Sequence, residues 1–137
     1  MLKSILLVVL GLFLFGMNGY AQSTYQDDKL NVSTNVLNYE DPTNDRFYDY
    51  YAFTVKNTYS EEIKFELVIN YSQSGSAGNT RSGDIQRIFT LAPGESLSAQ
   101  SLEDHKLVLF KSFLPGNNGT KASDASTEIS SIEVNYL

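Results

Sequence analysis

His105 is the only histidine in the chain and the first residue to consider for catalysis. A serine hydrolase would hold this imidazole between a serine and a carboxylate, and Ser101, Glu103 and Asp104 are near it in sequence. Residues so close on an extended chain point in different directions, and no Gly-x-Ser-x-Gly turn exposes a serine. The chain has no cysteine, which excludes thiol nucleophiles and thiolate metal sites. We therefore expect no catalytic residue.

Paired carboxylates could act as acid and base on a sugar if a cleft raised the pKa of one of them. The acidic residues of this chain fall mostly in predicted turns and at strand ends, where water keeps both members of a pair ionised. One acidic segment has the hard oxygen donors that suit Ca²⁺, and its candidate ligands are Glu40, Asp41, Asn44, Asp45 and Asp49. It lacks the alternating ligands and central glycine of an EF-hand. A solvated acidic loop is the simpler interpretation, and we expect no cofactor.

Aromatic residues are concentrated at residues 47–53, where this acidic segment ends. Strand alternation places Tyr51 and Phe53 on one face and Tyr48 and Tyr50 on the other, so one half can fill the core while the other stays outside. An exposed tyrosine offers an apolar ring with a polar tip, which suits contact with sugar rings or protein partners. Packing within the sheet is the alternative role. The predicted contact residues are Tyr48, Tyr50, Asp45 and Asp49.

Antiparallel sheets would position these residues, because apolar and polar side chains alternate through most of the chain. No amphipathic helix and no internal repeat interrupts the pattern. Loops are expected at residues 38–49, 72–83 and 114–126, which are rich in residues that favour turns. The spacing predicts seven strands, at residues 29–37, 50–56, 62–71, 84–91, 95–101, 105–113 and 127–136.

Four of these strands carry additional local signals. The second and third are expected to form a β-hairpin joined by a polar loop at residues 57–61. Residues 105–113 are apolar on both faces, which predicts a strand covered on both sides or one with an exposed contact stripe. The last strand changes its alternation phase at Ser130 and Ser131, as a β-bulge would require.

The start of the chain has the pattern of a secretory signal peptide. Lys3 is followed by an apolar run at residues 5–15, and Gly19 and Ala21 are small residues at the expected cleavage site. The run is much shorter than the ~20 residues that cross a bilayer, which disfavours the alternative of a retained anchor. We predict a signal peptide at residues 1–21, a flexible lead-in at 22–28 and a β-sandwich domain at 29–137, with no membrane span after cleavage.

The formal net charge of the chain is −6, and this acidity argues against nucleic acid as a partner. The VKN…EEIKFEL segment and the TLAPGES turn resemble those of small secreted bacterial immunoglobulin-like or fibronectin type III-like domains, although the antibody-type cysteines and tryptophan are absent. The resemblance covers about Leu30 to Tyr136, and the Ala21-Gln22 junction is similar to that of exported Bacteroidota proteins. It implies an all-β, antiparallel, seven-stranded immunoglobulin-like β-sandwich that serves as a binding, structural or accessory module.

From these observations we expect an exported, non-catalytic binding or accessory module in the periplasm, on the outer cell surface or in the medium. Its expected partner is another cell-envelope or extracellular protein, met through long loops or an unpaired edge strand. A carbohydrate-binding module that holds a polysaccharide on Tyr48 and Tyr50 is the first alternative. A small hydrolase is the second.

Overall fold

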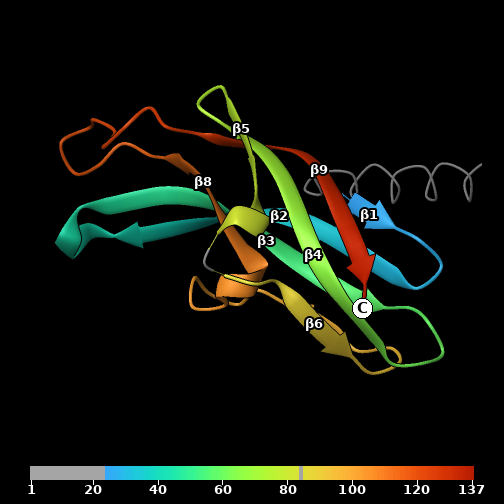
Figure 1. Cartoon of the computed structure of the whole chain (residues 1–137). Helices are drawn as coiled ribbons and strands as arrows, with labels where there is room; N and C mark the ends of the chain where they lie inside the picture. The colour runs from blue at the N-terminus through green and yellow to red at the C-terminus, as the bar shows by residue number, and fades with distance from the viewer. Residues whose placement is uncertain (1–23, 84) are drawn as a thin grey trace, which may run out of the picture.

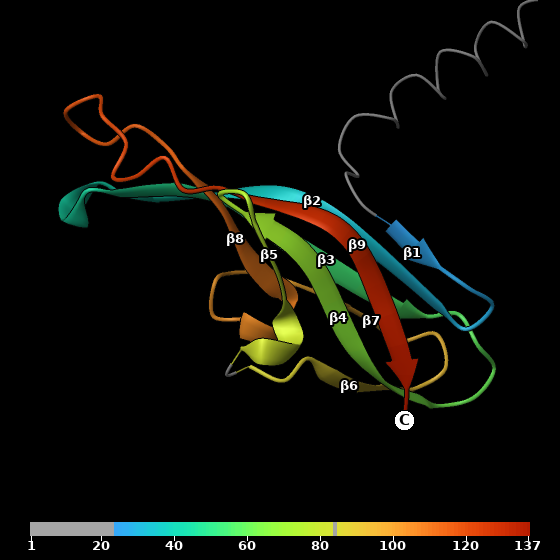
Figure 2. The same ribbon diagram turned by 45° about the horizontal axis from the view of Figure 1, so that its top comes forward.

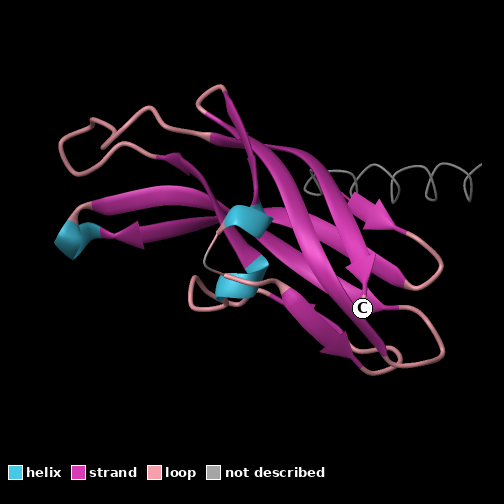
Figure 3. Ribbon diagram, in the orientation of Figure 1, coloured by secondary structure: helices cyan, strands magenta, loops and turns pink. Residues whose placement is uncertain are grey.

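The computed structural model describes residues 24–83 and 85–137, so the predicted signal peptide at residues 1–21 lies outside the described residues. The described chain is all-β, with nine strands and three short 3-10 helices but no longer helix (Figure 3). The strands are β1 (Thr24–Gln26), β2 (Leu30–Asp41), β3 (Arg46–Asn57), β4 (Ile63–Gln73), β5 (Ser76–Asn79), β6 (Ile88–Leu91), β7 (Ser96–Ser98), β8 (Val108–Phe113) and β9 (Thr127–Tyr136). The 3-10 helices are η1 (Pro42–Asn44), η2 (Thr80–Ser82) and η3 (His105–Leu107).

The first sheet, sheet A, is built around β3. β2 pairs antiparallel with β3 along its full length, from Leu30 opposite Asn57 to Asp41 opposite Arg46. The short strand β1 extends the sheet beyond β2, whereas β7 and β8 share the other side of β3. Residues 50–53 of β3 are all buried, so both faces of the strand are covered there.

The second sheet, sheet B, is built around β4. β9 pairs antiparallel with one side of β4, from Phe65 opposite Tyr136 to Gln73 opposite Thr127. β6 and β5 share the other side of β4. The two sheets face each other in both views of the chain (Figures 1 and 2). The side chains of β4 that enter the common core are Ile63, Phe65, Leu67 and Ile69.

One apolar core joins the two sheets. Phe53, Val55 and Leu30 of sheet A are fully buried in the same cluster as Phe65 and Leu91 of sheet B. Burial of such side chains contributes about 1.5–3 kcal/mol each relative to exposure, so this cluster is the main source of stability. The remaining members of the cluster are Val32, Tyr51, Ile63, Leu67, Ile69, Phe89 and Leu107.

The predicted hairpin between residues 50–56 and 62–71 is wrong, because β3 and β4 belong to different sheets. The segment that joins them crosses from one layer to the other. Asn57 holds this crossing, since its Nδ2 donates hydrogen bonds to the carbonyl oxygens of Glu61 and Leu91 at 2.8 and 3.1 Å. Each strand has an apolar face, and opposing the two faces across the core removes both from water, which side-by-side pairing would not do.

Nine strands are described where seven were expected, because pairing extends into segments that lack an apolar period. β1 lies in the predicted lead-in at residues 22–28, and β5 lies in the predicted loop at residues 72–83. The predicted loop at residues 38–49 consists mostly of the ends of β2 and β3, which continue their register to a turn at residues 42–45. Backbone pairing satisfies the peptide groups of these segments whatever their side chains are.

The predicted bulge in the last strand is confirmed. Asn70 pairs with Ser131 and Tyr71 pairs with Ile129, which leaves Ser130 as the extra residue of β9. The predicted strand at residues 105–113 begins later than expected, because His105–Leu107 form η3 and only β8 is extended. The expectation that this segment is covered on both faces holds in part, since every residue of β8 is half-buried.

The far end of the β2–β3 hairpin projects beyond sheet B (Figures 1 and 2). We call residues 38–49 the hairpin arm. The loop at residues 114–126 runs beside it in both views and is fastened to it by backbone hydrogen bonding, with Leu114 N donating to Phe47 O at 2.9 Å. This end of the molecule therefore brings together the predicted acidic segment, the tyrosines and a long loop.

Candidate functional site

An aromatic cluster lies where the hairpin arm meets β8. It consists of Tyr39, Tyr48, Phe110 and Phe113, all half-buried. The ring centroids of Tyr39 and Tyr48 are 4.9 Å apart, and those of Phe110 and Phe113 are also 4.9 Å apart. Tyr48 joins the two pairs, at 6.0 Å from Phe110 and 6.4 Å from Phe113. Such contacts stabilise the arm and leave an aromatic surface partly open to solvent.

Of the two tyrosines predicted to be exposed, only Tyr48 reaches this surface. Burial raises the pKa of its hydroxyl, and the nearby Tyr39 adds to the effect. Tyr50 is only 6% exposed, so the expectation that it is open to solvent is wrong. The reason is β8, which pairs with this part of β3 and places Phe110 opposite Tyr50.

Asp45 fastens the hairpin arm to the neighbouring loop. It adopts a left-handed conformation with φ of 53°, and its Oδ1 accepts a hydrogen bond of 2.7 Å from Asn117 N. The side chain of Asn117 in turn donates to Pro42 O at 2.9 Å. Asp49 is also engaged, because its Oδ1 accepts from Asn38 Nδ2 at 3.1 Å. Both predicted contact carboxylates thus have local structural roles.

The five candidate calcium ligands are distributed along the arm. Asp41 caps η1 by accepting from Asn44 N and Asn44 Nδ2 at 3.3 and 2.8 Å, and this bonding lowers the pKa of Asp41. Glu40 lies on β2 opposite Phe47, next to Asp41 in the register. Among the described residues, no three His, Cys, Asp or Glu side chains form a group that could hold a metal ion. Three of the candidate ligands, Asp41, Asp45 and Asp49, already accept hydrogen bonds, from Asn44, Asn117 and Asn38 respectively.

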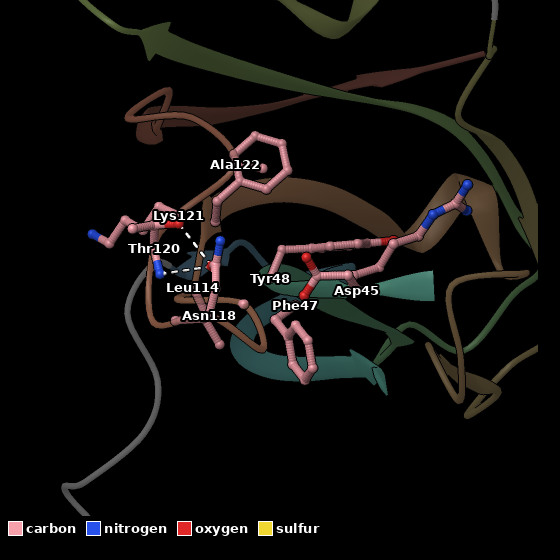
Figure 4. A pocket seen from close by; sticks show the side chains of 11 residues that line it. Asp45, Phe47, Tyr48, Leu114, Asn118, Thr120, Lys121 and Ala122 are labelled. Carbon is pink, nitrogen blue, oxygen red and sulfur yellow. Dashed lines mark hydrogen bonds between the residues drawn. The ribbon is translucent and has the colours of Figure 1, made fainter. Parts of the chain in front are cut away.

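A pocket of about 490 Å³ separates the arm from the loop at residues 114–126. Its lining combines the aromatic rings of Tyr48 and Phe113 with the charged side chains of Asp45, Arg46 and Lys121. Figure 4 shows the residues of the arm on one side and those of the loop on the other, with Asn118 and Thr120 joined by hydrogen bonds. A polar ligand with one apolar face would find both kinds of contact here.

His105 is exposed at the start of η3. The neighbouring carboxylate of Asp104 is used by the backbone, because its Oδ2 accepts from Gln100 N and Ser101 N at 2.6 and 3.2 Å. Within residues 24–83 and 85–137, no serine or carboxylate is hydrogen-bonded to the His105 side chain. The arrangement is therefore that of a loop stabilised by Asp104, and it lacks the contacts of a catalytic triad.

The open edge of β9 is a second candidate surface. β9 has ten residues and pairs only with β4, which makes it the longest described strand with a partner on one side alone. Its first residue is engaged with sheet A, because Tyr51 donates a hydrogen bond of 2.8 Å from its hydroxyl to Thr127 O. The edge beyond this contact runs from Ile129 to Tyr136.

The register shows which backbone groups of β9 face outward. Leu137 N donates to Lys64 O, whereas Leu67 N donates to Arg87 O on the opposite side of β4. Even-numbered residues of β4 therefore bond to β9, and their partners on β9 beyond the bulge are odd-numbered. The N–H and C=O groups of Ile132 and Val134 consequently point away from β4, while their side chains pack on the core. A second strand could pair with them.

The aromatic partners of Tyr48 are the part of the site that sequence reasoning missed. Tyr39 was expected in a loop, and Phe110 and Phe113 were expected in a strand of undetermined position. The apolar residues on both faces of residues 105–113 were the available signal, because a strand that also carries a contact surface produces this pattern.

No protein-family model matches the chain, and the searches of curated proteins and of solved structures also returned no match. In the part of the chain that the structure describes, no helix is both long enough and apolar enough to span a membrane.

Proposed function

We propose that this protein is an exported, non-catalytic binding module that engages another cell-envelope or extracellular protein by adding a strand of that partner to the edge of β9. The observation that carries the proposal is the long β9 edge, where the peptide groups of Ile132 and Val134 face away from β4. An exposed edge of this length is a ready template for a second chain. Strand addition gives affinity through main-chain hydrogen bonds and specificity through alternate side chains.

The charge of the strand indicates the chemistry of the partner. Glu128 and Glu133 are exposed on β9, where they lie opposite Ser72 and Val68 of β4. Opposite charges directly across a strand pair contribute roughly 0.2–1 kcal/mol, and like charges are unfavourable. A partner strand with lysine or arginine at alternate positions would therefore be preferred over an acidic one.

The bulge at Ser130 limits the surface to one part of the strand. Bulges twist an edge and interrupt regular pairing, and natural sheets use them against unwanted association. Residues 131–136 remain regular beyond the bulge. We infer that a partner strand adds to this regular part. The bulge would prevent other strands from pairing with the rest of the edge.

We also propose that the two sheets form an immunoglobulin-like β-sandwich. The support is that consecutive strands β3 and β4 lie in opposite sheets, and that later strands return to pair with each of them.

Export of the protein is part of the same proposal, based on the predicted signal peptide at residues 1–21. Mass spectrometry of the protein recovered outside the cytoplasm should then find Gln22 as the first residue, whereas an intact Met1 would contradict export with cleavage.

A proline at Val134 tests the proposed edge. Proline removes an N–H that points outward, and a strand tolerates it where the N–H is not used in the sheet. Val134→Pro should fold but lose capture of the partner from the cell envelope. Val134→Ala is the matched control, because it removes similar packing and keeps the N–H. The proposal fails if Val134→Pro, shown to be folded by circular dichroism, captures the same proteins as the unaltered chain.

The pocket beside Tyr48 supports carbohydrate binding as a second candidate function. Its aromatic and polar lining suits a sugar ring, and Tyr50 drops out of this hypothesis because it is buried. Retention on a polysaccharide column that disappears in Tyr48→Ala would support it. Passage of the unaltered protein without retention on a panel of polysaccharides would remove it.

A further inference from the structure

A groove on the other side of the aromatic cluster contains a buried cation. The hollow has a volume of about 540 Å³, within the range of small-molecule sites. Arg87 and His105 are its only residues with charged or titratable groups apart from tyrosines, and all its other lining residues are apolar or aromatic. They are Tyr48, Tyr50, Ile85, Leu102, Val108, Leu109, Phe110 and Phe113.

Arg87 is held firmly in this groove. Its side chain is mostly buried, as the residue is only 7% exposed. Its backbone carbonyl accepts a hydrogen bond from Leu67 N at 2.8 Å, which fixes the residue beside β4. Its Nη2 donates to Val108 O at 2.9 Å, which points the guanidinium toward β8. Arg87 also lines a smaller adjoining hollow that shares Ile85 and Leu109 with the first.

The guanidinium of Arg87 is incompletely satisfied. Its Nε is buried and has no hydrogen-bond partner among the described residues. The one salt bridge among the described residues joins Arg81 to Glu66 and does not involve Arg87. Burial lowers the pKa of Arg87, which reflects the cost of holding the charge away from water. Buried charges in proteins are usually paired, and no carboxylate among the described residues forms a salt bridge with Arg87, so an anionic ligand would suit this position.

We propose that the groove binds a small organic acid with a single carboxylate and an apolar body, such as a medium-chain fatty acid. The carboxylate would pair with the guanidinium of Arg87, which presents planar donors that suit it. The apolar body would lie along Ile85, Leu102 and Phe110. Ile85 is 39% exposed, and a ligand placed there would cover one of the largest exposed apolar side chains of the described chain.

The chemistry of the lining distinguishes this ligand from others. A phosphate or a sugar would leave most of its polar groups facing apolar side chains, which costs free energy. A neutral hydrocarbon would leave the Arg87 charge unpaired. The site is separate from the proposed β9 edge and does not depend on the proposed function.

Calorimetric titration of the mature protein, residues 22–137, with decanoate, decanol and decylamine tests the proposal below the concentrations at which these compounds aggregate. Decanoate should bind about 10-fold or more tightly than decanol, because charge-assisted hydrogen bonds contribute about 1.5–3 kcal/mol. Decylamine should not bind measurably. Equal affinity for decanoate and decanol, or no binding of decanoate, would overturn the proposal.

Arg87→Met should abolish the preference for decanoate over decanol while it keeps an apolar side chain of similar length. Arg81→Met is the matched control, because Arg81 is an exposed arginine and should leave decanoate binding unchanged. Unchanged decanoate affinity in a folded Arg87→Met variant would refute the site.

A second variant covers the case in which Arg87→Met does not fold. Ile85→Glu places a carboxylate on an exposed residue of the same groove and should block decanoate while retaining the fold. Val134→Pro should still bind decanoate, so failure at the β9 edge and failure at this groove are distinguishable. Decanoate binding that survives Ile85→Glu would place the ligand elsewhere and contradict the proposal.

Discussion

The hydroxyl of Tyr136 donates a hydrogen bond of 2.6 Å to Oδ2 of Asp27. This contact joins the last strand of sheet B to the turn between β1 and β2 of sheet A. Tyr25 donates to the same oxygen at 2.7 Å, and the N–H groups of Lys29 and Leu30 both donate to Oδ1 at 2.8 Å. One carboxylate therefore fastens the two ends of the described chain together.

The pH dependence of stability should report the ionisation of Asp27. Desolvation opposes ionisation, but the hydrogen bonds from Tyr136, Tyr25 and the backbone lower the pKa of Asp27 from 3.8 to about 2. Because the pKa is lower in the folded state, the stabilisation is complete above about pH 5 and is lost as the pH falls toward 2. The shift corresponds to at most about 2.5 kcal/mol, which screening at a partly exposed site reduces to about 1 kcal/mol.

Urea denaturation of Asp27→Asn between pH 2 and pH 7 measures this contribution. The variant should be less stable than the unaltered protein at pH 7 by about 1 kcal/mol and should approach it at pH 2. Asp28→Asn is the control, because Asp28 is exposed and should leave the pH profile unchanged. A stability difference for Asp27→Asn that is the same at both pH values would show that the ionised carboxylate contributes nothing.

Asn57 should be the polar side chain on which folding depends most. It is fully buried, and its Nδ2 donates to the carbonyl oxygens of Glu61, Leu91 and Ala92, while its Oδ1 accepts from Tyr59 N at 2.8 Å. Asn57→Ala would leave several of these groups unpaired, and we expect a loss of about 3 kcal/mol in the free energy of unfolding.

Denaturant unfolding followed by fluorescence gives the measurement for Asn57→Ala. Asn38→Ala is the comparison, because the Asn38 side chain is exposed and makes one hydrogen bond to Asp49. That change should cost roughly 0.5 kcal/mol or less. Similar losses for the two variants would mean that the crossing between β3 and β4 does not rely on Asn57.

The sequence was sufficient for the local features that depend on alternation. The inward faces of Tyr51, Phe53 and Val55 follow from a period of two, and the bulge at Ser130 follows from a change of phase. The sequence does not state which strands pair, since an apolar face can meet a partner beside it or across the core. The β3–β4 link was misassigned for this reason.

The same limit applies to the candidate site: its local features follow from the sequence, and its long-range contacts do not. Tyr48 was placed correctly near a surface, whereas the burial of Tyr50 depends on Phe110, a residue far away in the chain. Arg87 was not singled out, because one arginine within an otherwise ordinary strand pattern carries no signal of its burial. Its burial becomes visible only in the fold, where Nη2 donates to Val108 O of β8 and Nε has no hydrogen-bond partner among the described residues.

The contact between the hairpin arm and the loop at residues 114–126 should be separable from folding. A Cβ added at Gly116 would lie 2.6 Å from Asp45 Oδ1, so Gly116→Ala must displace the carboxylate that binds Asn117 N. We expect faster hydrogen exchange of the Asn117 amide, with a change of about 1 kcal/mol or less in global stability, because the contact is exposed.

Gly83→Ala is the matched control for this prediction. Gly83 has φ of −86°, and an added Cβ there would meet only Thr80 O at an ordinary 3.6 Å. Amide exchange measured by NMR should distinguish the two variants at Asn117. Unchanged protection of that amide in Gly116→Ala would show that Asp45 does not hold the loop.

Removal of the regular end of β9 should unfold the protein. β9 supplies the whole ladder on one side of β4, and Ile132 and Val134 pack against the core. Loss of residues 132–137 would therefore expose Leu67 and Ile69 of β4 and leave its peptide groups unpaired, a cost well above the 5–15 kcal/mol stability of an ordinary domain once both effects are counted. Removal of Leu137 alone, which is 65% exposed, should be tolerated. Limited proteolysis gives the readout, and a protease-resistant fragment ending at Ser131 would show that sheet B folds without this strand.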